Sequence, residues 1–250
     1  MLESVIFHPE FDPAEVISSI RQHGVALLKN VLPRDQMMAV TDPVRRHYDL
    51  IDEQATSGQM DTAFRDWILL NGLAAPNLPD TLKAIVDIVA GTQIGDCART
   101  YFNNGDLALA DNHFLFRVRN ERTDKMAMEK GTRHLFHQDH DLVDLSFPMN
   151  VWIPLTKIDS GCTGLTFVFP YTTQIFPLPF DIERYLIKNN GSLWTPELDI
   201  GDALLFHHCT IHGSFIDGSN RASRYSAEFR IGLREKVPAS YAEFLRPLKL

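Results

Sequence analysis

Short segments with a period of two residues fill the second half of the sequence and constrain its fold most. Apolar and polar side chains alternate from residue 112 to 119, and strand-like runs follow at 149–155, 165–169, 203–207 and 224–233. Clusters of Gly, Asp, Ser and Asn separate these runs. Many short strands divided by turn residues favour an all-β sandwich or barrel over a parallel α/β sheet.

The front third of the sequence is typical of helices. Asp12-Pro13-Ala14-Glu15 combines an N-cap acid, a proline at the first helical position and a glutamate three residues after the cap, and Gly24 ends the run. Residues 25–28 form a predicted buried strand, and further helices are expected after Pro33 and from Pro79.

Together these patterns predict a mainly β fold with a helical flank, packed as a jelly roll. We expect residues 1–110 to form the flank with the first strand, and residues 111–235 to form the core. No linker or repeat interrupts the 250 residues, so a single domain spanning 1–250 is predicted.

Three residues are candidate metal ligands. His137 and Asp139 stand two positions apart, so on a strand both side chains point to the same face. His212 lies further along, in a strand that ends in His-Gly-Ser. Two histidines and one carboxylate on one face of an octahedron are diagnostic of non-haem Fe(II) oxygenases.

Two arginines follow His212, and strand register would choose between them. If residues 217–219 form a three-residue hairpin loop, Arg224 lies opposite His212 and shares its face, whereas a two- or four-residue loop would favour Arg221. The strand that begins at Arg224 also alternates polar and apolar residues. Its polar face either meets solvent or lines a pocket in which a guanidinium binds a carboxylate.

These stretches resemble the phytanoyl-CoA dioxygenase family of Fe(II)- and 2-oxoglutarate-dependent oxygenases. The matching segments are residues 24–32, 132–139, 151–155, 164–170 and 201–230. The match needs a one-residue insertion between His212 and Arg224, and Tyr171-Thr172-Thr173 replaces the Gly-Ser-His that the family often has.

The resemblance implies a double-stranded β-helix of the cupin type, with His137, Asp139 and His212 binding Fe(II). It implies that Arg224, helped by Ser214, binds the distal carboxylate of 2-oxoglutarate, with Gln138 and Trp152 against the cosubstrate. We expect His113, His134 and Asn150 to line the substrate pocket. Halogenating relatives replace the carboxylate ligand with a small residue, so Asp139 argues for an O2-dependent oxidation, most simply a hydroxylation that releases succinate and CO2.

Composition limits the classes of partner that the protein is expected to bind. Lys and Arg number 24 against 32 Asp and Glu, and the net charge of −8 disfavours nucleic acid and anionic membranes. We expect a small-molecule substrate, a cytoplasmic location and three buried free thiols, Cys97, Cys162 and Cys209; the oligomeric state and the substrate stay open. The alternatives are a catalytically silent ligand-binding scaffold of the same fold and a zinc hydrolase with the same ligands.

Overall fold

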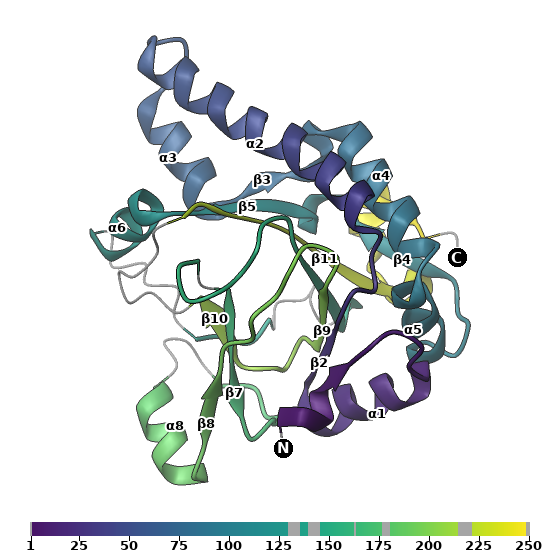
Figure 1. Ribbon diagram of the computed structural model, residues 1–250. Coiled ribbons are helices and arrows are strands. Elements are labelled where there is room, and N and C mark those ends of the chain that lie inside the picture. Colours follow the sequence, from purple (N-terminus) through teal and green to yellow (C-terminus); the bar gives the residue numbers. More distant parts are fainter. Residues whose placement is uncertain are drawn as a thin grey trace.

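The computed structural model describes residues 2–129, 136–139, 146–162, 164–176, 181–214 and 222–248 (Figure 1). The helices in this part are α1 (Pro13–His23), α2 (Arg34–Thr56), α3 (Thr62–Asn71), α4 (Pro79–Ala90), α5 (Gln93–Tyr101), α6 (Glu121–Glu129) and α8 (Ile182–Asn189). The strands are β1 (Ile6–Phe7), β2 (Val25–Leu28), β3 (Leu73–Ala74), β4 (Leu107–Ala110), β5 (Leu115–Arg119), β6 (Met149–Pro154), β7 (Leu165–Phe169), β8 (Ser192–Trp194), β9 (Ala203–His207), β10 (His212–Ser214), β11 (Arg224–Leu233) and β12 (Leu245–Pro247).

Local signals set the helix ends where the sequence predicts them. The Asp12 carboxylate accepts a hydrogen bond from the Ala14 amide at the start of α1, and Gly24 ends the helix in the left-handed region at φ 82°. Helices follow Pro33 and begin at Pro79 as expected. These caps work through neighbouring residues only, so they can be read from the sequence.

Two sheets face each other. Within the described residues, the large sheet has 9 strands in the order β1-β2-β9-β6-β11-β4-β12, with β5 paired to β11 and β3. The small sheet has 3 strands in the order β10-β7-β8. The sheets, with helices against the large one (Figure 1), confirm the predicted jelly-roll class with a helical flank.

Alternation along the strands divides the apolar side chains between two cores. Residues such as Leu28, Ile153 and Phe229 point outward and pack under the helices. Leu27 and Trp152 point inward, where they meet Phe167 of the small sheet. The inner face of β11 is an exception, because it carries polar and charged residues at alternate positions.

Three expectations need correction. The core begins before residue 111, since β3 and β4 precede it, and residues Asp111–His113 form a 3₁₀ turn rather than a strand. Residues Glu121–Glu129, which follow β5, form the helix α6. In the described residues, β10 pairs with β7, whereas β11 pairs with β4, β5 and β6. The hairpin that would set His212 opposite Arg224 is therefore wrong, and Arg221 and residues 217–219 lie outside the described residues.

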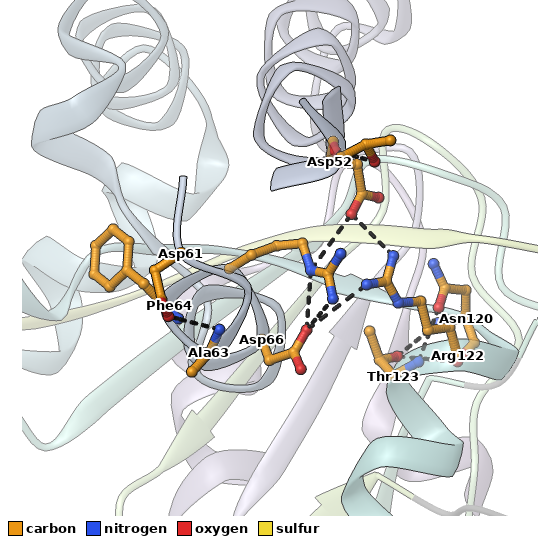
Figure 2. Close-up of polar contacts among 10 residues, drawn as sticks. Asp52, Asp61, Ala63, Phe64, Asp66, Asn120, Arg122 and Thr123 are labelled. Carbon is orange, nitrogen blue, oxygen red and sulfur yellow. Dashed lines mark hydrogen bonds and ion pairs between the residues drawn. The ribbon is translucent and has the colours of Figure 1, made fainter. Parts of the chain in front are cut away.

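Salt bridges fasten α6 to the helices outside the large sheet. Figure 2 shows the Arg122 guanidinium between Asp52 of α2 and Asp66 of α3, with nitrogen–oxygen distances of 2.9 and 3.7 Å. Asn120 and Thr123 cap the helix through reciprocal hydrogen bonds between side chain and amide.

No helix in the described part of the chain is long and apolar enough to cross a membrane. All three cysteines are free and buried.

Candidate metal and cosubstrate site

A cavity of about 180 Å³ lies between the two sheets. The small sheet and the segment bridged to it contribute His137, His212 and Ser214, and the large sheet contributes Asn150 from β6 and Arg224 from β11. The polar face of β11 thus lines a pocket rather than meeting solvent.

The predicted metal ligands come together on one wall. Reciprocal backbone hydrogen bonds of 2.9 Å bridge His137 and His212, whose ring centroids lie 4.5 Å apart. The Nε2 of His137 lies 3.6 Å from the Oδ1 of Asp139. One donor atom from each of His137, Asp139 and His212 lies within 4.8 Å of the other two. A donor set of two imidazoles and one carboxylate at this separation fits a divalent metal ion.

Hydrogen bonding prepares His212 as a ligand. Its Nδ1 lies 2.9 Å from the carbonyl oxygen of Thr210. Because a carbonyl only accepts, Nδ1 carries the proton and Nε2 keeps a free lone pair. Burial and the neighbouring His137 lower the pKa of His212 to about 4, so its ring is neutral near pH 7.

Asp139 is held as a carboxylate. The Asn150 amide donates to Oδ2 at 2.8 Å, and the Arg230 guanidinium lies 3.3 Å from Oδ1. Burial raises the pKa of Asp139, but Arg230, the two histidines and the Asn150 hydrogen bond outweigh it and lower the pKa to about 2. The group is therefore ionised at neutral pH, as a metal ligand requires.

Arg224 faces the triad from the opposite sheet. It opens β11, is only 2% exposed and lines the cavity. Its guanidinium carbon lies 5.6 Å from the ring centre of Trp152. Burial and the neighbouring Arg119 lower the pKa of Arg224 to about 9, so a buried anion beside it would relieve the cost of its charge.

The other residues predicted to bind the cosubstrate differ in where they lie relative to the cavity. Ser214 lies on the cavity wall. Trp152 is buried behind the wall and touches the site through Arg224. Gln138 does not line the cavity in the described residues: its amide donates to the carbonyls of Gln174 and Cys209 and accepts from the Phe176 amide. Position 138 stands between two residues that face the cavity, so strand alternation already implied this orientation.

The residues expected to line the substrate pocket also differ in their position and contacts. His113 lines the cavity and its Nδ1 lies 2.8 Å from an Arg230 nitrogen. Asn150 lines the cavity too, although its hydrogen bonds with Asp139 and Arg230 make it a support of the carboxylate. His134 lies outside the described residues. Sequence analysis missed Arg230, Arg119 and Glu228, although two of them fall on the polar face of the 224–233 strand.

His207, His208 and Cys209 form a second group whose donor atoms lie close together. Burial raises the pKa of Cys209, which keeps it a thiol, and the Nδ1 of His207 already accepts from the Tyr171 hydroxyl and the Cys209 amide. The group contains no carboxylate. The His137, Asp139 and His212 group is the better metal site.

Comparison with known proteins agrees with this geometry. The profile of the phytanoyl-CoA dioxygenase (PhyH) family matches residues 20–225. The chain belongs to this family. Its membership, together with the His/Asp group, supports oxygenase-type activity of the non-haem, 2-oxoglutarate-dependent kind, with Fe(II), 2-oxoglutarate and O2 as cofactors. No curated protein matches the chain.

Solved structures share the fold at low identity. The non-haem α-ketoglutarate-dependent epimerase SnoN from nogalamycin biosynthesis is 16% identical, with a TM-score of 0.57 over 93% of this chain and 88% of SnoN. The non-haem monooxygenase ThoJ is 15% identical, with a TM-score of 0.57 over 95% of this chain and 80% of ThoJ. The carbocyclase SnoK is 12% identical, with a TM-score of 0.58 over 90% of this chain and 85% of SnoK.

Proposed function

We propose that the protein is an Fe(II)- and 2-oxoglutarate-dependent dioxygenase that hydroxylates an unactivated C–H bond of a small-molecule metabolite and releases succinate and CO2. One observation carries the proposal: a single cavity has a His/Asp/His donor group on one wall and the buried Arg224 on the facing wall. A silent scaffold needs neither feature, and a zinc hydrolase has no use for a buried arginine.

His137, Asp139 and His212 would hold the metal. Bound Fe(II) would supply the activation of O2 that is coupled to oxidative decarboxylation of 2-oxoglutarate. The chain's own part is positioning: Thr210 sets the tautomer of His212, and Asn150 aims the Asp139 carboxylate.

Arg224 and Ser214 would bind the distal carboxylate of 2-oxoglutarate. A guanidinium can donate two parallel hydrogen bonds to a carboxylate, and burial strengthens such bonds because water does not compete. Trp152 would keep the Arg224 guanidinium in place through its ring face.

The small-molecule substrate class has support from a related fold. SnoN has been solved with Fe3+, α-ketoglutarate and nogalamycin RO. SnoN is an epimerase and SnoK a carbocyclase, so proteins of this fold differ in the reaction they catalyse. We propose hydroxylation as the simplest of them, in a cytoplasmic enzyme.

Spectroscopy and succinate release test the proposal. Anaerobic addition of Fe(II) and 2-oxoglutarate should produce a weak visible charge-transfer band, and a metabolite library should contain compounds that trigger succinate formation. His137→Ala and Asp139→Ala should abolish succinate formation, whereas Arg224→Ala should mainly raise the concentration of 2-oxoglutarate that the reaction requires. Absence of the band, with zinc retained through purification, would favour the hydrolase, and loss of cosubstrate affinity in Arg221→Ala instead of Arg224→Ala would move the anchor to Arg221.

A further inference from the structure

Hydrogen-bond donors gather around Arg224, and one of them, Arg119, lines the cavity as Arg224 does. Arg119 lies directly opposite Arg224 in the pairing of β5 with β11, so both side chains point to the same face. Ser226 follows two positions along that face, and Trp152 lies against the Arg224 guanidinium.

These neighbours are buried with their hydrogen-bonding capacity unused. Among the described residues, Nη1 and Nη2 of Arg119, Oγ of Ser226 and Nε1 of Trp152 make no hydrogen bond. Buried polar atoms are rarely left in this condition, and a guanidinium and an indole can only donate. For Arg119, which lines the cavity, the group that would satisfy its nitrogens is an acceptor with negative charge, such as a carboxylate.

Arg119 is one of several residues that hold α6 in place. Among the described residues, its ion-pair partner is Asp124 of that helix, with Nη1 3.4 Å from Oδ1. Arg122 already ties α6 to α2 and α3 from outside, as Figure 2 shows, and Asn120 and Thr123 cap its first turn. Arg119 differs in this from Arg117 on the same strand, whose guanidinium donates to Glu228 at 2.6 Å.

We propose that Arg119 is a second cosubstrate-binding arginine, which donates to the distal carboxylate of 2-oxoglutarate beside Arg224. The inference rests on the proposed function. A carboxylate has about four lone-pair positions, so it can accept a bidentate pair from Arg224 and a further bond from Arg119. It would also separate two guanidinium groups that otherwise face each other. Burial lowers the pKa of Arg119 to about 10, which agrees with a cation short of negative charge.

The test compares two keto acids on Fe(II)-loaded protein without oxygen. 2-Oxopentanoate has the carbon chain of 2-oxoglutarate but lacks the distal carboxylate. Dissociation constants for both come from titration of the charge-transfer band. Arg119→Gln should reduce the preference for 2-oxoglutarate over 2-oxopentanoate by about 10- to 100-fold, the usual effect of one charge-assisted hydrogen bond. The affinity for 2-oxopentanoate should stay nearly unchanged, because Arg119 does not touch the chelating end.

Asp124→Asn is the matched control, because it breaks the same ion pair and keeps Arg119. It should retain the preference for 2-oxoglutarate. If it lowers the preference as much as Arg119→Gln does, or if Arg119→Gln weakens both ligands equally or neither, Arg119 is a structural or substrate-facing residue and the inference fails.

Arg119→Lys keeps the experiment informative if Arg119→Gln does not fold. Lysine keeps the charge and loses the planar fork, so the preference should fall by a smaller factor. An unchanged preference in Arg119→Lys would contradict a direct contact of the fork. A wild-type protein that binds neither keto acid would overturn the proposed function itself, which separates that failure from the failure of the Arg119 assignment.

Discussion

Two neighbours hold the Asp139 carboxylate at the residue scale. Asn150 donates to Oδ2 and also accepts from the Arg230 Nε at 3.0 Å, so its amide is fixed between the two charges. Oδ1 lies 3.6 Å from the Nε2 of His137 and 3.3 Å from the Arg230 guanidinium. Outer hydrogen bonds of this kind orient ligands, and their loss costs metal affinity.

Asn150→Ala should therefore weaken metal binding by about 10- to 100-fold. The measurement is a titration with Fe(II) under anaerobic conditions. Asn189→Ala is the control, because the Asn189 side-chain amide donates to the Tyr185 carbonyl within α8 and lies outside the cavity lining. Equal metal affinity in the two variants would show that Asn150 does not orient the carboxylate.

His207 gives the fold a dependence on pH. Burial and the neighbouring His208 lower the pKa of His207 to about 4. Its Nδ1 accepts hydrogen bonds from the Tyr171 hydroxyl at 3.0 Å and the Cys209 amide at 3.2 Å. Protonation of Nδ1 would break the bond from the Cys209 amide and reverse the bond with the Tyr171 hydroxyl. The unfolded chain takes up this proton near pH 6.5 and the folded chain only near pH 4. The contribution to stability is complete above pH 6.5 and declines as the pH falls from about 6.5 to about 4.

His207→Gln should make this decline shallower, by up to about one proton in the slope of unfolding free energy against pH. Urea denaturation of the metal-free protein between pH 7 and 5 measures the slope. His212 contributes in the same direction in both proteins, since its pKa is also lowered to about 4. Identical slopes would mean that His207 is not buried as a neutral ring.

At the scale of elements, the corner between α1 and β2 supports the site. The Gly24 carbonyl accepts from the His207 amide at 2.8 Å and from the Thr210 hydroxyl at 2.7 Å, and Thr210 in turn fixes His212. Gly24 has φ +82°, and a Cβ there would lie 2.7 Å from the Thr210 hydroxyl oxygen and against the Tyr171 ring. A side chain at this corner would be both strained and crowded.

Gly24→Ala should destabilise the protein by about 2–4 kcal/mol, the sum of left-handed strain and overpacking. Gly58→Ala is the matched control, because Gly58 has φ +77° with nothing within 4 Å of the added Cβ. Its cost should be about 1–2 kcal/mol, from the strain alone. Urea denaturation gives both values, and equal losses would show that the corner relaxes around the methyl group.

Elements that depend on local signals can be predicted from the sequence, and their pairing cannot. Strand β11 has the predicted bounds of residues 224–233, because alternation and turn residues are local signals. The pairing of that strand is not local. His212 and Arg224 belong to strands of two different sheets instead of one hairpin. Helix α6 is short and mostly charged or polar, and the Asn120 and Thr123 cap is the local signal of its start that sequence analysis missed. The site residues were found by spacing and resemblance, whereas Arg119 needed the long-range pairing of β5 with β11.

At the scale of the whole molecule, the site joins the two sheets. His212 belongs to the small sheet and Arg224 to the large one, so metal and cosubstrate together would link both walls of the cavity. Binding to the folded state alone at about 100 times Kd adds about 2.7 kcal/mol of stability. For a chain of 250 residues this corresponds to a rise in Tm of about 5–10 °C.

Anaerobic thermal denaturation with Fe(II), and then with Fe(II) and 2-oxoglutarate, should therefore raise the Tm in two steps while the transition stays single. In Arg224→Ala the step due to Fe(II) should remain and the step due to 2-oxoglutarate should largely disappear, because only the second ligand would reach the large sheet. A 2-oxoglutarate step of equal size in Arg224→Ala would place the distal carboxylate elsewhere. A transition that splits in two would show that the sheets unfold independently, against a site that joins them.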